Sequence, residues 1–178
     1  MVNVYIVSDT HFGHANIIRY CNRPFADARE MDAAMIERWN ATVRPQDHVY
    51  HLGDVAMSQA ALHRVMPRLH GHKRLILGNH DNVAPISNYA QYFGKILMWR
   101  QFHPLLLTHA PIHPGSFGKM RVNVHGHIHQ QPSPEGPYLN ACVEWRDYTP
   151  VHLDTLIADA RSLCHVCFPL SRRPPRRR

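Results

Sequence analysis

The chain has 178 residues, of which 44% are hydrophobic and 19% are charged. This length and composition are those of one globular domain with its own hydrophobic core, and they exclude a disordered chain. No apolar run approaches the roughly 18 residues that cross a bilayer. The N-terminal segment reaches Ser8 and Asp9 too early for a signal peptide, so we expect a cytoplasmic protein without membrane contact.

The net charge of +7 is unevenly distributed, because residues 171–178 contain five arginines and the rest of the chain carries only +2. We therefore expect a domain over residues 1–170 and a basic Arg/Pro-rich tail over residues 171–178. The tail predicts weak nucleic-acid contact, with a solvated end lacking a specific partner as the alternative. Cys164 and Cys167 have the spacing of half a zinc knuckle. Since no second pair completes such a site, we expect two thiols in a C-terminal element.

Hydrophobic patterning predicts alternating strands and helices. In chain order the elements are strand 2–8, helix 30–43, strand 48–52, helix 58–69, strands 73–77, 95–99, 102–107, 121–125 and 138–145, and helix 153–163. The first helix places Met31, Met35 and Trp39 on one face, which we expect in the core. Trp145 and Tyr148 are also expected to be packing residues.

The chain has 16 histidines, and several lie beside Asp, Asn and Gly in loops that follow predicted strands. In open α/β sheets, ligands bind outside the carboxyl ends of the strands, so we expect these loops to converge on one site. The loops contain Asp9-Thr-His11, Gly53-Asp54, Gly78-Asn79-His80-Asp81, His109, and Gly126-His127-Ile-His129.

These loops offer oxygen and imidazole donors and no thiolate, a set that suits manganese, iron, zinc, nickel or cobalt. Seven candidate donors exceed the needs of one cation, but they suit two divalent cations about 3.5–4 Å apart that share a carboxylate. Asp54 is alone on its loop and is the predicted shared ligand. Glycines 53, 78 and 126 precede the donors and permit close backbone approach. Two such cations would lower the pKa of a bridging water and neutralise charge on phosphoryl oxygens.

The motif series D-x-H, G-D, G-N-H-D, H and G-H-x-H, in this order, resembles the calcineurin-like metallophosphoesterases. The resemblance implies an α/β fold, a four-layer α/β/β/α sandwich of two mixed β-sheets. It also implies the two ligand sets. One metal would take Asp9, His11, Asp54 and His129, and the other would take Asp54, Asn79, His109 and His127.

In this family the position of His80 contacts phosphate and protonates the leaving oxygen, a role that suits an imidazole. Asn79 would share the substrate contact, and Asp81 would hold the His80 ring as part of the catalytic group. The G-D-x-x-D-R-G pattern of the large Ser/Thr phosphatases is absent after Gly53, which argues against a protein phosphatase.

The strings Ser8–His14, Asn22–Phe25 and Tyr50–Asp54 resemble a compact branch of the family, found in bacteria and their phages, without a cap domain. A phage-encoded member would act in the host cytoplasm. The resemblance places His14 and Arg23 on the wall of the site, where Arg23 would pair bidentately with phosphate oxygens.

The sequence therefore predicts a metal-dependent phosphoric ester hydrolase that uses a metal-bridging hydroxide, with manganese the favoured metal. A phosphodiesterase acting on small nucleotides, 2′,3′-cyclic ones included, is favoured. A phosphomonoesterase and a nuclease using the same site remain open, as does the oligomeric state. A non-catalytic binding scaffold is the remaining alternative, and the presence of every ligand and of His80 argues against it.

Overall fold

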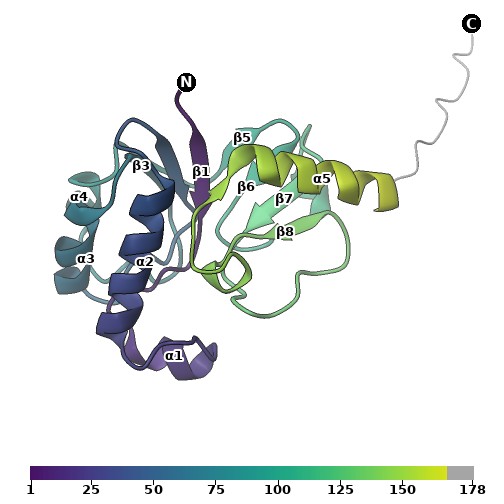
Figure 1. The fold of residues 1–178 in the computed structure, drawn as a ribbon. Coiled ribbons are helices and arrows are strands. Elements are labelled where there is room, and N and C mark those ends of the chain that lie inside the picture. The colour runs from purple at the N-terminus through teal and green to yellow at the C-terminus, as the bar shows by residue number, and fades with distance from the viewer. Residues whose placement is uncertain (168–178) are drawn as a thin grey trace, which may run out of the picture.

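The computed structural model describes residues 1–167, with side chains as far as residue 163. The predicted tail at residues 171–178 and the thiols of Cys164 and Cys167 lie outside the described part. Two mixed sheets form the centre of the fold, and helices flank them (Figure 1). This arrangement confirms the predicted α/β sandwich of two mixed sheets.

The first sheet has the strand order β4-β3-β2-β1-β9. Its strands are β1 (Val4–Val7), β2 (His48–His51), β3 (His72–Ile76), β4 (Lys95–Leu97) and β9 (Val151–His152). Strands β1 to β4 are parallel, and β9 pairs antiparallel with β1. The carboxyl ends of β1, β2 and β3 therefore lie at one edge of this sheet.

The second sheet has the order β5-β6-β7-β8. Its strands are β5 (Arg100–Phe102), β6 (Leu105–Leu107), β7 (Val122–His125) and β8 (Tyr138–Asn140). Strands β6, β7 and β8 are parallel, and β5 is antiparallel to β6. The loops after β6 and β7 carry His109 and Gly126, so this sheet also presents donors at the carboxyl ends of its strands.

The helices are α1 (Ala15–Tyr20), α2 (Ala28–Thr42), α3 (Gln59–Val65), α4 (Ile86–Ala90) and α5 (Leu153–Cys167). Helix α2 begins at Asp27, whose carboxylate accepts hydrogen bonds from two first-turn amides. Met31, Met35 and Trp39 are buried on one face of α2, as predicted. The Trp39 indole also donates to the carbonyl of His70, which satisfies its polar group in the core.

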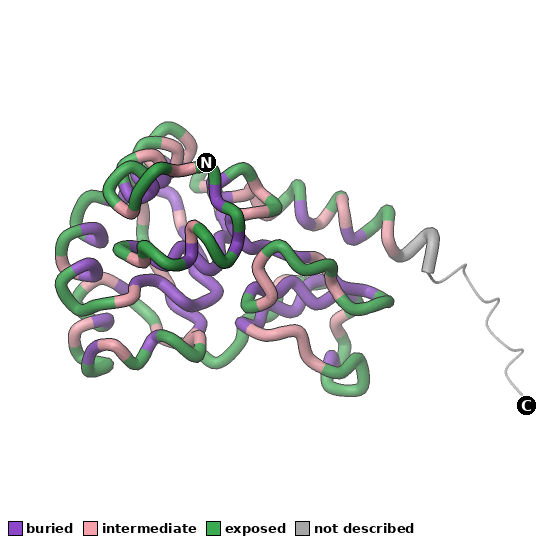
Figure 2. The backbone as a smooth tube through the Cα atoms, turned by 90° about the horizontal axis from the view of Figure 1, so that it is seen from below, coloured by how far each residue is buried: buried purple, intermediate pink, exposed green. Residues whose placement is uncertain are grey.

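Two large apolar layers and a smaller cluster around Phe117 hold the molecule together, and buried stretches of backbone run through its middle (Figure 2). One layer joins the outer face of the first sheet to α2 and α3, through residues such as Val49 and Leu62. The other lies between the sheets, where Ile6 and Leu52 meet Leu105 and Val124. Helix α5 packs along β1, β8 and β9 and adds Leu156 and Ala160 to this second layer.

Several element boundaries differ from the prediction. The predicted strands at 95–99 and 102–107 are three short strands. The predicted helix at 58–69 stops at Val65, and a 3-10 turn at Met66–Arg68 follows because Pro67 has no amide hydrogen to continue the helix. The predicted strand at 138–145 ends at Asn140. There the chain crosses to the first sheet, where the amide of Val143 donates to the carbonyl of Ser8.

The crossing segment forms a 3-10 turn at Val143–Trp145 and carries Glu144 toward the carboxyl end of β1. Trp145 is 51% exposed, so its predicted packing role is wrong, whereas Tyr148 is buried as expected. Within the described residues, none of the helices combines the length and the apolar character that a bilayer crossing requires.

Candidate metal centre

The predicted donor loops converge where the carboxyl ends of β1, β2, β3, β6 and β7 meet. The donors fall into two groups that can each surround an ion: Asp9 with His11 and His129, and Asp54 with His109 and His127. Within each group the ligand atoms lie within 4.8 Å of one another. Asn79 joins the second group, because its Oδ1 lies 2.8 Å from His109 Nε2.

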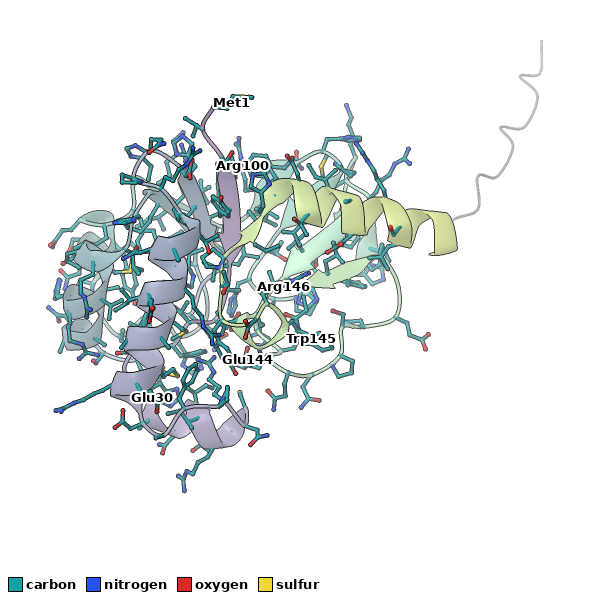
Figure 3. All side chains as sticks on the ribbon, viewed as in Figure 1. Met1, Glu30, Arg100, Glu144, Trp145 and Arg146 are labelled. Atoms are coloured by element: carbon teal, nitrogen blue, oxygen red, sulfur yellow. The ribbon has the colours of Figure 1, made fainter. Side chains whose placement is uncertain are left out.

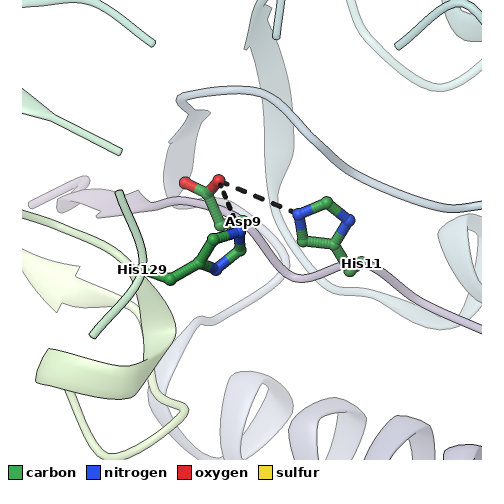
Figure 4. A group of neighbouring side chains, drawn as sticks. All are labelled: Asp9, His11 and His129. Carbon is green, nitrogen blue, oxygen red and sulfur yellow. Dashed lines mark ion pairs between the residues drawn. The ribbon is translucent and has the colours of Figure 1, made fainter. Parts of the chain in front are cut away.

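The two oxygens of the Asp9 carboxylate have different roles: one accepts hydrogen bonds from the protein, and the other faces the donor group. Oδ2 accepts hydrogen bonds from the Ser8 hydroxyl, the His127 amide and the Cys142 thiol. Oδ1 is buried without a hydrogen-bond partner and lies 3.9 Å from a ring nitrogen of both His11 and His129 (Figure 4). Burial raises the pKa of Asp9, since the charged form loses its hydration. A cation between these three groups would supply the missing partner.

His11 shows the same lack of a partner. Both of its ring nitrogens are buried without a hydrogen bond. Burial, followed by the neighbouring His129 and Arg23, lowers the pKa of His11, so the ring is neutral and offers a lone pair. A neutral imidazole beside two carboxylates is the form that binds divalent metals.

Asp54 lies between the two groups. Its Oδ2 is 3.5 Å from His11 Nε2 and 3.7 Å from His109 Nε2. Its Oδ1 accepts the His80 amide at 2.8 Å, which fixes the carboxylate plane. Ligands about 2.1 Å from a common ion are separated by roughly 3–4 Å, so one Oδ2 atom is placed to serve both groups. This is the position expected of a shared ligand.

The second group is oriented by hydrogen bonds behind it. His109 Nδ1 lies 2.8 Å from the Leu52 carbonyl, to which it can only donate. The tautomer that can bind a metal therefore has its lone pair on His109 Nε2, which faces Asn79 Oδ1 and, at 3.2 Å, His127 Nδ1. Such a backbone carbonyl behind a histidine is the usual support of a metal ligand. The donor set thus fits two divalent cations.

The backbone at the site is strained. Among the described residues eight non-glycine residues have a positive φ, and five of them are predicted ligands: Asp9, His11, Asp54, His127 and His129. This conformation is costly for side chains and persists where surrounding structure enforces it, often at functional sites. Its concentration here indicates that the loops are shaped for the position of their side chains.

Close approach requires all three predicted glycines, and at Gly78 and Gly126 the approaching groups are ligands of the site or their neighbours. A Cβ at Gly78 would overlap the Asp54 carboxylate, and a Cβ at Gly126 would overlap the side chains of Ser8 and Asp9. The loops are also bonded to one another, with the amide of Asp9 donating to the carbonyl of Gly53. The close approach predicted from the sequence is confirmed at all three positions.

His51 connects the loops that follow β1 and β2 by hydrogen bonds. Its Nδ1 accepts the Gly53 amide, and its Nε2 lies 2.9 Å from the Thr10 hydroxyl. Burial lowers the pKa of His51 to about 3, so it stays neutral and can accept that amide. A histidine outside the donor set therefore joins the loops that follow β1 and β2.

Asp81 has a different partner from the one expected. Its two oxygens accept the backbone amides of Asp54, Val55 and Gly78. None of its hydrogen bonds within the described residues reaches the His80 ring. Asp81 thus joins the loop after β3 to the loop after β2. The predicted contact of Asp81 with the His80 ring is wrong, because Asp81 binds the backbone around Asp54 instead.

His80 itself lies at the mouth of the site. It is exposed, and its ring centre is 5.4 Å from that of His11. The His14 ring also lies beside that of His11, with ring centres 5.6 Å apart. Both histidines border the site, so their predicted contact with substrate stays a prediction that the geometry permits.

Arg23 is buried, and its guanidinium is fully engaged. It donates to the carbonyls of Asp9 and Thr10, to the Met31 sulfur, and twice to Glu144 Oε1. These bonds use all five N–H groups. The arrangement favours a supporting role, because a phosphate contact, as predicted from the sequence, would require one of these bonds to break.

Glu144 is a functional residue that sequence reasoning missed. Its Oε1 lies 3.1 Å from His129 Nδ1 and accepts Arg23 at 2.7 Å, and the segment that carries it crosses near the lower centre of the molecule (Figure 3). Burial opposes protonation of His129, but hydrogen bonds to Cys21 and Glu144 and the charge of Asp9 raise its pKa to about 10. A positive charge is therefore favoured here, whether carried by imidazolium or by a metal ion.

Two sheets whose strand ends surround oxygen and imidazole donors are the arrangement of a metal-dependent hydrolase. Residues 2–139 match the sequence model of the Calcineurin-like phosphoesterase superfamily domain. An uncharacterized protein of Methanocaldococcus jannaschii is 35% identical over 167 residues, which cover 88% of this chain and 90% of that protein. The chain belongs to the calcineurin-like phosphoesterase superfamily. Membership implies metal-dependent phosphoester hydrolysis and divalent metal ions at this site.

The chain is also similar to a phage protein and to two solved structures. Gene 66 protein of Mycobacterium phage L5 is 36% identical over 95 residues, covering 51% of this chain and 45% of that protein. A solved structure of a protein of unknown function from Aquifex aeolicus has 26% identity and a TM-score of 0.70, covering 89% of this chain and 99% of that one. The nuclease MPE of Pseudomonas putida, at 21% identity and a TM-score of 0.52, shares the fold over 71% of this chain and 61% of its own.

The shared position of Asp54 yields a prediction about metal content. Asp54→Ala should lose both metal ions, whereas Asp9→Ala should lose only one. Both residues have φ of 58°, so the strain of an alanine is matched between the variants. Metal per chain is measured after dialysis against manganese, with circular dichroism as a check of folding. Two metals retained by Asp54→Ala would refute the shared role.

The support of His129 by Glu144 yields a second prediction. Glu144→Gln removes the negative charge beside the His129 ring. We expect it to weaken manganese binding at one site about tenfold, as the loss of a hydrogen-bond partner of a metal ligand does. Asp147→Asn is the control, because in the described part of the chain this exposed carboxylate pairs with Arg38 alone. Calorimetric titration with manganese resolves the two sites. Unchanged affinity in Glu144→Gln would show that the contact is merely structural.

Proposed function

We propose that the chain is a phosphodiesterase that hydrolyses small nucleotide diesters, 2′,3′-cyclic nucleotides included, with manganese as its metal. The observation that carries the proposal is the position of Asp54 Oδ2 between His11 and His109, which joins two donor groups into one site. Two divalent cations bound there would supply a water of lowered pKa and neutralise charge on the phosphoryl oxygens.

The engagement of Arg23 supports a diester over a monoester. A phosphomonoester carries an additional negative charge, which a free guanidinium would balance. Here the Arg23 donors are held by Glu144, by Met31 and by the backbone of residues 9 and 10. A diester lacks this additional charge and does not need a free guanidinium. The arrangement of Arg23 therefore favours binding of diesters over monoesters.

The residues at the site differ in exposure, and this difference indicates the side from which a substrate approaches. Asn79, His80 and His127 are exposed, whereas Asp9 and His11 are buried. A phosphate ester would therefore approach from the side of Asn79 and His127. His80 lies at this entrance, where its imidazole can bind a phosphoryl oxygen and give a proton to the leaving oxygen.

A hydrolysis panel tests the proposal. Para-nitrophenyl diesters and monoesters, linear and 2′,3′-cyclic nucleotides and a polynucleotide are compared with manganese, zinc, nickel and cobalt. We expect kcat/KM for diesters to exceed that for monoesters about tenfold, equivalent to roughly 1.4 kcal/mol in transition-state binding. Faster monoester hydrolysis would reverse the assignment, and a preference for the polynucleotide would favour a nuclease.

The proposed acid yields a further prediction. His80→Ala should keep both metals and lower kcat by about 10²–10⁴ for alkyl leaving groups, with a much smaller loss for para-nitrophenol. His72→Ala, an exposed histidine at the opposite end of β3, is the matched control. The slope of log kcat against leaving-group pKa is the readout. A uniform loss across leaving groups would assign His80 to positioning instead.

A further inference from the structure

A mainly apolar pocket adjoins the metal centre on the side of the second donor group. Its volume is about 570 Å³. Its walls come from the end of β3, the turn between β4 and β5, β5, β6 and the loop that follows β6. That volume lies within the roughly 300–1,000 Å³ of small-molecule sites. The pocket is therefore large enough for a nucleoside.

Two lining residues connect the pocket to the site. His109 lines it while its Nε2 faces Asn79 in the donor group. Leu77 lines it and directly precedes Gly78-Asn79 in the chain. Because the donors and the pocket share these residues, an ester with its phosphorus at the donors can place a substituent in the pocket.

The pocket wall exposes large apolar side chains that a folded chain normally covers. Trp99 is 60% exposed and Met98 is 69% exposed, and both lie at the turn between β4 and β5. Phe117 and Leu106 continue the apolar wall, and Gln101 and Ser116 add an exposed amide and hydroxyl. An indole beside polar groups suits a flat aromatic ring with hydrogen-bonding edges.

We propose that this pocket binds the nucleobase of the diester substrate, with the base stacked on Trp99 and its edge facing Gln101 and Ser116. The inference rests on the proposed phosphodiesterase function and names the group that its substrate carries. Stacking on an exposed indole depends little on base identity, so the pocket favours nucleotides over alkyl esters without selecting one base.

Two diesters with one leaving group test the pocket. The para-nitrophenyl ester of thymidine monophosphate is compared with methyl para-nitrophenyl phosphate, so that the bond broken is the same. We expect the wild type to favour the thymidine ester about tenfold in kcat/KM, and Trp99→Ala to abolish most of this preference. Trp99→Phe should retain it. Ile86→Ala, an exposed apolar residue outside the pocket, is the control and should change nothing.

The methyl ester has no base to bind in the pocket. An unchanged rate of its hydrolysis therefore shows that a variant is folded and holds its metals. A preference that survives Trp99→Ala, or a wild type without preference, would overturn the pocket assignment and leave the phosphodiesterase proposal intact. A Trp99-dependent dimer in sedimentation that thymidine does not dissociate would also overturn it, because a second copy would then cover the pocket.

Binding of the nucleoside alone separates the two proposals. If neither ester is hydrolysed with any metal, the phosphodiesterase proposal fails, and calorimetric titration with thymidine then decides on the pocket. Binding that Trp99→Ala abolishes and Trp99→Phe keeps would support a base pocket. No binding of thymidine by the wild type at millimolar concentration would overturn it.

Discussion

The carboxylate of Asp54 joins the two halves of the molecule. It follows β2 in the first sheet, and its Oδ2 lies between His11, which follows β1, and His109, which follows β6 in the second sheet. Around it, lone-pair atoms converge at 2.8–3.9 Å. Such a cluster is unfavourable unless positive charge sits among its members. Metal binding and the closure of the two sheets at this edge are therefore coupled.

The backbone is arranged to bring these atoms together. Five ligands adopt a positive φ, and the chain compensates with hydrogen bonds behind them. Asp81 accepts three amides from the loops around Asp54, and His51 holds Gly53 and Thr10. Neither residue belongs to the donor groups. Strain at the ligands is thus offset by polar groups buried one layer beneath them.

The sequence predicted those parts of the site that depend on local order. Strand ends followed by Asp, His and Asn indicated which loops converge, and Gly78 and Gly126 indicated close approach. It could not predict Glu144, because this residue reaches Arg23 across 121 positions through a crossover that replaced a predicted strand. For the same reason the sequence did not indicate that Arg23 binds Glu144, and a phosphate contact was predicted for Arg23 instead. Trp99 gave no signal either, since its exposure follows from how β4 and β5 meet.

The ligands of the site differ in burial, and this difference gives the site a direction. The enclosed half contains the buried ligands Asp9, His11, Asp54 and His109. The Glu144–Arg23 pair lies behind His129, so this half is shielded from water. Asn79, His80 and His127 are exposed, and the pocket beside His109 opens on their side. Charge interactions are stronger in the enclosed half, where the dielectric is low. The enclosed half therefore holds the metal ligands in position, while the open half is where the substituents of the ester can be recognised.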